Sequence, residues 1–266
     1  MRIGNSEIVV LEDAAVLGYK AAEIFVRLIS EASSRKAQVS VALSGGSTPK
    51  ALFSLLVEDD SFKNNIPWDK IHFFWGDERH VPPRDEQSNF RMANEIMLAK
   101  ADIRAQNIHR MPTEQSDSAK VAQDYEKELL KFFRLTTGQL PVFDFNLLGL
   151  GPDGHTASLF PGTRALYEHN RLVVANWVEK FQTHRITMTA PVLNNAETLV
   201  FLVSGKEKAE VLQQVLEGDH QPNRLPAQLI RPTHGKLIWL VDRAAASKLT
   251  LTVQGSGVQG SKVGSI

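Results

Sequence analysis

The chain has 266 residues, of which 42% are hydrophobic and 23% charged, an ordinary composition for a globular protein of one large or two small domains. Thirty Lys and Arg balance thirty Asp and Glu, so the general phosphate attraction of a nucleic-acid-binding protein is missing, whereas a local basic pocket for one small anion is still allowed. The absence of cysteine excludes disulfides, thiolate catalysis and Cys-ligated zinc.

Helical and strand-like segments alternate along the chain. From Ala14 to Ala32 the apolar residues recur at helical spacing, and later apolar runs are short enough for buried strands. Ser47 and Thr48 are candidate caps of a helix with Pro49 in its first turn. The expected helices cover 14–32, 47–56, 88–100, 117–134 and 206–218, and the expected strands cover 39–46, 70–79, 142–151, 171–178, 184–190, 198–205 and 236–246.

Several of these strands are apolar at nearly every position. Continuous apolar strands are typical of a parallel sheet that helices cover on both faces. We therefore predict a single α/β domain over residues 1–250, with a mainly parallel, Rossmann-like sheet. Residues 251–266 are rich in Gly and Ser, which predicts a flexible C-terminal tail.

The sequence carries no signal for export or for a membrane. The N-terminus lacks the apolar run and cleavage site of a signal peptide, and no apolar stretch is long enough to span a bilayer. We expect a cytoplasmic protein, or one of another intracellular compartment, without a membrane or nucleic-acid partner. The sequence leaves open whether it is a monomer or a homodimer.

A glycine turn joins the first buried strand to a helix at Ser44–Thr48. In an open α/β sheet, ligands bind outside the carboxyl ends of the strands. The free N–H groups and the dipole of a helix N-terminus favour an anion there, although a plain strand-to-helix turn is an equal alternative. The spacing matches neither the P-loop nor G-x-G-x-x-G. Arg185, Lys206 and Lys208 are cations that could complete a phosphate site.

Charged residues also follow the next strand. Asp77 ends an apolar run and is followed by Glu78 and Arg79. Three adjacent charges usually form a solvated loop, but the apolar residues before them anchor this loop to the core. A functional and a structural interpretation are equally open here.

Asp153 and His155 follow the third strand, separated by one glycine. An apparent helix over 155–160 would place the imidazole at a helix N-terminus, where the dipole favours the neutral ring that can accept a proton from water. A core or surface histidine is the alternative. No H-x-x-x-H or H-E-x-x-H spacing supports a metal site, and without a G-x-S-x-G elbow Ser158 is interpreted as an ordinary helix residue.

Six motifs in order resemble the 6-phosphogluconolactonases of the glucosamine/galactosamine-6-phosphate isomerase superfamily. The resemblance covers most of the chain and implies an α/β fold without a metal or organic cofactor. It implies hydrolysis of a phosphosugar lactone, 6-phospho-D-glucono-1,5-lactone, to 6-phospho-D-gluconate, the second step of the oxidative pentose phosphate pathway. The motifs are LSGGSTPK, FFWGDERHVPPRDEQSN, NLLGLGPDGHTASLFPG, RITMTAPVLNNA, LVSGKEKAEVL and LPAQLIRP.

The resemblance also implies roles for particular residues. The D-G-H histidine of the family maps to His155, and Arg79 to a second basic group near the substrate. For the mechanism we expect His155 to be the general base that activates water, Asp153 or Asp77 to orient the imidazole, and Arg79 or a backbone N–H to stabilise the oxyanion. The residues implied to bind substrate are Ser44, Gly45, Gly46, Ser47, Thr48, Arg79, Arg185 and Lys208.

Two other functions were weighed against this one. Related glucosamine-6-phosphate deaminases carry a glutamate before a proline where this chain has Phe160. They also have a D-E-Y stretch where this chain has Asp77, Glu78 and Arg79. Both departures favour the lactonase. A sugar-phosphate sensor without catalysis is disfavoured because the anion motif and His155 are both present.

Overall fold

The computed structural model describes residues 2–3 and 6–250, and the predicted tail 251–266 lies outside them. Its central sheet has seven strands in the order β1-β2-β10-β9-β6-β3-β4, parallel except for the β1–β2 pair. The predicted mainly parallel α/β sheet is therefore confirmed. The strands are β1 Arg2–Ile3, β2 Ser6–Leu11, β3 Val39–Leu43, β4 Ile71–Trp75, β6 Phe145–Gly149, β9 Thr198–Val203 and β10 Lys236–Asp242.

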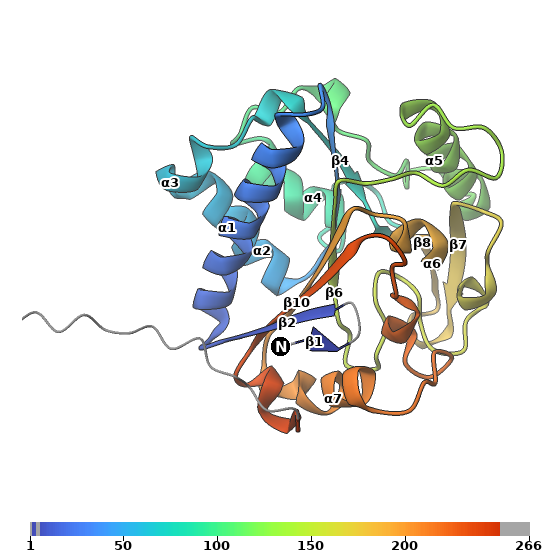
Figure 1. Ribbon diagram of the computed structural model, residues 1–266. Helices are drawn as coiled ribbons and strands as arrows, with labels where there is room; N and C mark the ends of the chain where they lie inside the picture. Colours follow the sequence, from blue (N-terminus) through green and yellow to red (C-terminus); the bar gives the residue numbers. More distant parts are fainter. Residues whose placement is uncertain (1, 4–5, 251–266) are drawn as a thin grey trace, which may run out of the picture.

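Helices lie on both sides of this sheet. Figure 1 shows α1 and α2 on one side, and α5 with two strands of a smaller sheet on the other. The apolar spacing between Ala14 and Ala32 predicts α1 well, since its buried residues follow that spacing. The helices are α1 Ala14–Ser33, α2 Ser47–Glu58, α3 Asp60–Lys63, α4 Asn89–Ala93, α5 Ser118–Phe132, α6 Ala190–Asn194 and α7 Ala209–Glu217. None of the helices among the described residues is long and apolar enough to cross a bilayer.

The smaller sheet corrects one prediction. The segment 70–79 is not a single strand: β4 ends at Trp75, and after Gly76 the chain continues as β5 Asp77–Arg79, which pairs with β8 instead. The strands β5, β8 Thr183–Met188 and β7 Val173–Val178 form an antiparallel sheet in the order β5-β8-β7. This change of sheet places Asp77 and Arg79 beside β8. The two strands are more than a hundred residues apart in the sequence, so no local pattern indicates that they pair.

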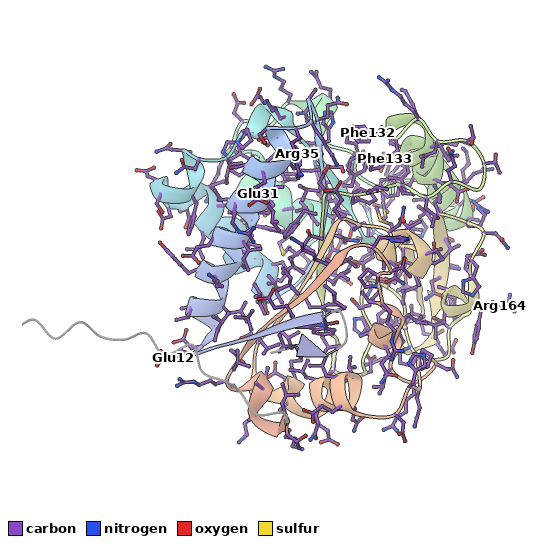
Figure 2. The ribbon with its side chains drawn as sticks, viewed as in Figure 1. Glu12, Glu31, Arg35, Phe132, Phe133 and Arg164 are labelled. Atoms are coloured by element: carbon purple, nitrogen blue, oxygen red, sulfur yellow. The ribbon has the colours of Figure 1, made fainter. Side chains whose placement is uncertain are left out.

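An aromatic cluster fixes the outer edge of the central sheet. Phe132 and Phe133, labelled in Figure 2, end α5 and pack on Phe74 of β4 with ring centroids 5.0 and 5.9 Å away. Phe143 meets Phe74 edge to face at 5.4 Å. Aromatic pairs of this kind add to the stabilisation from burial alone. The cluster holds the long 117–143 segment against the strand that leads into Asp77.

Two helix starts differ in how they are capped. Ser88 caps α4, since its hydroxyl accepts from the Arg91 N–H at 3.1 Å. Ser47 and Thr48 do not cap α2, contrary to the prediction. The N-cap is Gly46, with a φ of 113° and no side-chain bond to the helix, so the first N–H groups of α2 are left for another partner.

Candidate functional site

A cleft of about 280 Å³ opens at the carboxyl edge of the central sheet, between β3, β6 and the smaller sheet. Eight of the eleven predicted site residues line it: Ser44, Gly45, Gly46, Asp77, Arg79, His155, Arg185 and Lys208. Ser47, Thr48 and Asp153 do not line this cleft. Ser47 and Thr48 lie in the first turn of α2, directly behind Gly46.

The glycine turn is shaped by close contact with α4. A Cβ on Gly45 would lie 1.9 Å from Oδ1 of Asn89, so only glycine fits there. The Asn89 amide donates to the Asp77 carbonyl at 3.0 Å and ties this turn to β5. The residues at the mouth of α2 thus present backbone N–H groups to the cleft, the arrangement that binds anions in many α/β proteins.

Arg79 and Arg185 occupy paired positions on β5 and β8. Burial lowers the pKa of Arg185, and the charge of Arg79 lowers it further. Arg185 is only 8% exposed, and within the described residues its guanidinium has no hydrogen bond or ion pair. It lies instead over the ring of Phe181, 5.2 Å from the centroid. Two adjacent cations, one of them buried and neither in an ion pair among the described residues, favour a negatively charged ligand, although the nearby carboxylates of Asp77 and Glu78 partly offset the charge of Arg185.

His155 contacts Asp153 but does not begin a helix, so that prediction is wrong. Residues 155–160 form a loop in which Thr156 and Leu159 pair as a bridge, and Ala157 has a φ of 46°. No helix dipole therefore acts on the imidazole. Nδ1 of His155 instead forms a very short hydrogen bond to Oδ1 of Asp153. This contact fixes the ring and leaves Nε2 free of partners within the described residues.

The charge of Asp153 is well stabilised. Burial by itself would raise the pKa of Asp153, but the hydrogen bond and charge of His155 outweigh burial and hold that pKa well below its usual range. Lys180 adds to this from 3.5 Å. An ionised carboxylate on Nδ1 stabilises the imidazolium that would form if Nε2 accepted a proton.

The His155 ring is packed between a glycine and an aromatic ring. A Cβ on Gly151 would lie 2.0 Å from Nδ1 and Cε1 of His155. On the other side Phe160 stacks on the imidazole, with centroids 4.1 Å apart and planes inclined by 25°. The orientation of the imidazole is therefore set by packing as well as by Asp153.

Asp77 is held by a residue that the sequence did not single out as functional. Oγ of Ser158 donates to Oδ2 of Asp77 at 2.6 Å, and both side chains are buried. Asn176 in turn donates to the Ser158 carbonyl at 2.9 Å. Ser158 is therefore not the ordinary helix residue that was predicted. No hydrogen bond or ion pair joins Asp77 to His155, so of the two candidate orienting carboxylates only Asp153 bonds to the imidazole.

Glu78 anchors the loop that carries Arg79. Its carboxylate is 1% exposed and accepts from the N–H groups of Arg79, Asn89 and Phe90 at 2.7–2.8 Å. Burial raises the pKa of Glu78, and these backbone hydrogen bonds oppose that rise. The contacts join β5 to the first turn of α4, which fixes both sides of the cleft entrance.

Lys208 is positioned by a carboxylate at the end of β10. Asp242 accepts from the Ser204 hydroxyl at 2.5 Å and from the Gly205 N–H at 3.0 Å. Gly205 has a φ of 103°, which turns the chain after β9 into the segment that carries Lys208. Lys206 is exposed and does not line the cleft, so of the two lysines only Lys208 reaches it.

Several cleft residues were missed by sequence reasoning: Asn89, Ser158, Phe181 and, for its stacking, Phe160. Asn89 and Ser158 act through partners far away in the sequence, whereas Phe160 stacks on His155 within its own loop and Phe181 meets Arg185 just across its turn. In this part of the cleft the sequence offered one local signal, the glycine turn around Gly151. Among the described residues, no group of three or more His, Asp or Glu side chains is arranged to hold a metal ion.

Comparison with known proteins places these features in a family context. The family model for glucosamine-6-phosphate isomerases/6-phosphogluconolactonase matches residues 12–239. The chain is 42% identical to the 6-phosphogluconolactonase of Synechocystis sp., over 90% of this chain and 97% of that protein. It is 39% identical to the 6-phosphogluconolactonase of Nostoc sp., over 91% and 98%. The structure of 6-phosphogluconolactonase from Trypanosoma cruzi superposes with a TM-score of 0.81 at 32% identity, over 92% and 97% of the two chains.

Proposed function

The chain belongs to the family of glucosamine-6-phosphate isomerases and 6-phosphogluconolactonases, and from this premise we propose that it hydrolyses 6-phospho-D-glucono-1,5-lactone to 6-phospho-D-gluconate with His155 as the general base. The observation that carries the proposal is the arrangement of one cleft. It combines two adjacent arginines that form no ion pair within the described residues with an imidazole whose Nε2 has no hydrogen-bond partner there. Such a cleft suits a substrate with an anionic end and an electrophilic end.

The phosphate of the substrate would bind at the mouth of α2. The N–H groups after Gly46, together with Arg185 and Lys208, would neutralise its charge. Binding at this remote group fixes the lactone carbonyl relative to His155 and so converts binding energy into orientation. Asp77, whose Oδ2 accepts from Ser158, has a second oxygen available to a sugar hydroxyl.

The chemical step needs a base and an oxyanion partner. Nε2 of His155 takes a proton from water as the water oxygen attacks C1, and the carbonyl electrons move onto oxygen to give a tetrahedral oxyanion. Arg79 or a backbone N–H stabilises that oxyanion. When the oxyanion collapses, the C1–ring oxygen bond breaks and the imidazolium returns the proton to the departing ring oxygen. Asp153 stabilises the imidazolium between these two transfers.

A deaminase or isomerase reaction on an amino sugar phosphate is the alternative within the same family. Phe160 argues against it, because its ring lies stacked on His155 and cannot transfer a proton to an opening sugar ring. Supplying glucosamine 6-phosphate and measuring ammonia tests this alternative directly, and release of ammonia at a rate comparable to lactone hydrolysis would replace the proposal.

The lactonase proposal is tested by following acid release from freshly prepared 6-phosphogluconolactone above its spontaneous rate. His155→Ala is expected to lower turnover by about 10²–10⁴-fold, the usual contribution of a general base. Binding of inorganic phosphate should survive in that variant. The exposed His169 provides a matched control, and His169→Ala should keep full turnover. Near-normal turnover in His155→Ala would remove the imidazole from the mechanism.

A further inference from the structure

Phe181 is a large apolar side chain that remains 44% exposed at the rim of the cleft. It lies in the short turn Glu179–Phe181 that joins β7 to β8. An exposed phenylalanine costs solvation free energy, and this one borders a cleft lined with charged groups. Its contacts give a reason for its position.

The Phe181 ring meets both halves of the cleft. On one side the Arg185 guanidinium lies over it at 5.2 Å. On the other side Phe160 meets it edge to face at 5.7 Å, and Phe160 itself stacks on His155. Two aromatic rings, Phe181 and then Phe160, therefore connect the buried cation to the proposed base.

The turn that carries Phe181 is rigidly held. The Glu179 carboxylate accepts from Nε1 of Trp177 at 2.8 Å and from Nε2 of Gln182 at 2.7 Å. Gln182 adopts a left-handed conformation with a φ of 50°, and its side chain also donates to the Glu179 carbonyl at 3.0 Å. This bonding closes the turn, so the Phe181 ring is presented at a fixed place.

Arg185 depends on that ring. Its guanidinium lies over that ring and forms no hydrogen bond or ion pair within the described residues, although the charges of Asp77 and Glu78 also act on it. Attraction between a cation and an aromatic face strengthens as the pair is removed from water, and here the Arg185 side is buried while Phe181 stays 44% exposed. A long side chain without other polar contacts would otherwise be free to sample several rotamers.

We propose that Phe181 is a positioning residue for substrate, which holds the Arg185 guanidinium toward the anionic group and supports Phe160 behind His155. The expected effect on KM rests on the proposed lactonase function. The expected effect on phosphate affinity rests on anion binding alone. The aromatic face, rather than apolar bulk, is the property that matters for Arg185. Phe181 makes no bond to a reacting atom, so its effect falls on binding.

The test compares Phe181→Leu, which keeps apolar bulk without the ring, with Phe181→Tyr, which keeps the ring. Phe181→Leu should raise KM for the lactone by about three- to tenfold, with turnover within twofold, and should weaken binding of inorganic phosphate by a similar factor. Phe181→Tyr should retain both values. Tyr19 is 46% exposed on α1, and Tyr19→Leu is the matched control that should change neither.

The phosphate measurement separates this inference from the proposed function. If the unmodified protein does not hydrolyse the lactone, the proposed function fails, while the phosphate affinities of the variants still decide the role of Phe181. The inference is overturned if Phe181→Leu leaves phosphate affinity and KM unchanged, or if turnover falls while KM stays constant. A loss in Phe181→Tyr equal to that in Phe181→Leu would also overturn it.

Discussion

Arg79 and Arg185 face each other as a register pair on β5 and β8, two like charges on adjacent strands. Directly opposite like charges destabilise a sheet by about 0.2–1 kcal/mol. Burial of the Arg185 side chain adds a desolvation cost that the charges of Asp77 and Glu78 offset only in part. Stability alone does not explain this pair, whereas an anionic ligand between the two guanidinium groups would.

Replacing Arg185 by methionine should therefore separate stability from binding. Arg185→Met removes the repulsion while keeping apolar volume, so the free energy of unfolding should stay constant or rise by up to about 1 kcal/mol. KM for the lactone should rise by roughly 10- to 100-fold, since a charge-assisted hydrogen bond is worth about 1.5–3 kcal/mol. Thermal unfolding and initial-rate kinetics measure the two effects.

Arg35, exposed at the end of α1 and labelled in Figure 2, supplies the control for that experiment. Arg35→Met should leave KM unchanged. A marked loss of stability in Arg185→Met, with KM near that of the unmodified protein, would show that the buried guanidinium is structural.

Two glycines of one turn give a matched pair for the His155 orientation. A Cβ at Gly151 would meet the imidazole at 2.0 Å, whereas a Cβ at Gly149 would meet nothing within 4 Å. Gly151→Ala should therefore displace the ring and lower turnover by at least tenfold, while phosphate affinity is retained. Gly149→Ala should behave like the unmodified protein. Equal turnover in the two variants would mean that the imidazole position is not critical.

Ser158→Ala tests the support of Asp77. The variant removes the 2.6 Å hydrogen bond to a buried carboxylate, which should lower the free energy of unfolding by about 1–3 kcal/mol. Turnover should also fall, because Asp77 would no longer be fixed in the cleft. Urea unfolding measures the first effect and initial rates the second. Thr163, whose hydroxyl accepts from Asn176 in the same network, gives a comparison variant, Thr163→Val, in which Asp77 keeps its donor.

The cleft could be predicted from sequence only in part, and the reason is the range of the contacts. The glycine turn after β3 and the presence of charged residues after β4 follow from local patterns of apolar residues and glycines. The loop over 155–160 was predicted as a helix, because its local sequence allows one. Its actual form depends on Ser158 bonding to Asp77, 81 residues away. The stacking of Phe181 with Arg185 and Phe160 likewise exists only after β5, β7 and β8 pair.

A pair of hydrogen-bonded histidines lies outside the cleft and bears on the stability of the protein. His72 and His109 share a hydrogen bond of 2.9 Å between Nδ1 and Nε2, with Gln38 on the far nitrogen of His72 and Glu128 on that of His109. Burial, and then the neighbouring His109, lowers the pKa of His72 to about 4. Burial also lowers the pKa of His109, although Glu128 opposes this.

The sign of the pH effect follows from these directions. Above pH 6.5 His72 is neutral in both the folded and unfolded chain, and its contribution to stability is fully present. As the pH falls toward 4, the unfolded chain binds a proton that the folded protein does not, so the free energy of unfolding decreases. At about 1.4 kcal/mol per pKa unit, the titration of His72 lowers the free energy of unfolding by about 3 kcal/mol at most between neutral pH and pH 4.

Replacing His72 by phenylalanine should flatten this dependence. Urea unfolding at several pH values between 7 and 4 should give a steep fall in the free energy of unfolding for the unmodified protein and a shallower one for His72→Phe. The comparison uses slopes, since His72→Phe also breaks the bond to Gln38 and so lowers stability at every pH. His169→Asn, at an exposed site, should keep the original slope. Parallel curves for His72→Phe and the unmodified protein would mean that the buried pair does not govern acid sensitivity, because only a group that titrates differently in the two states can change the slope.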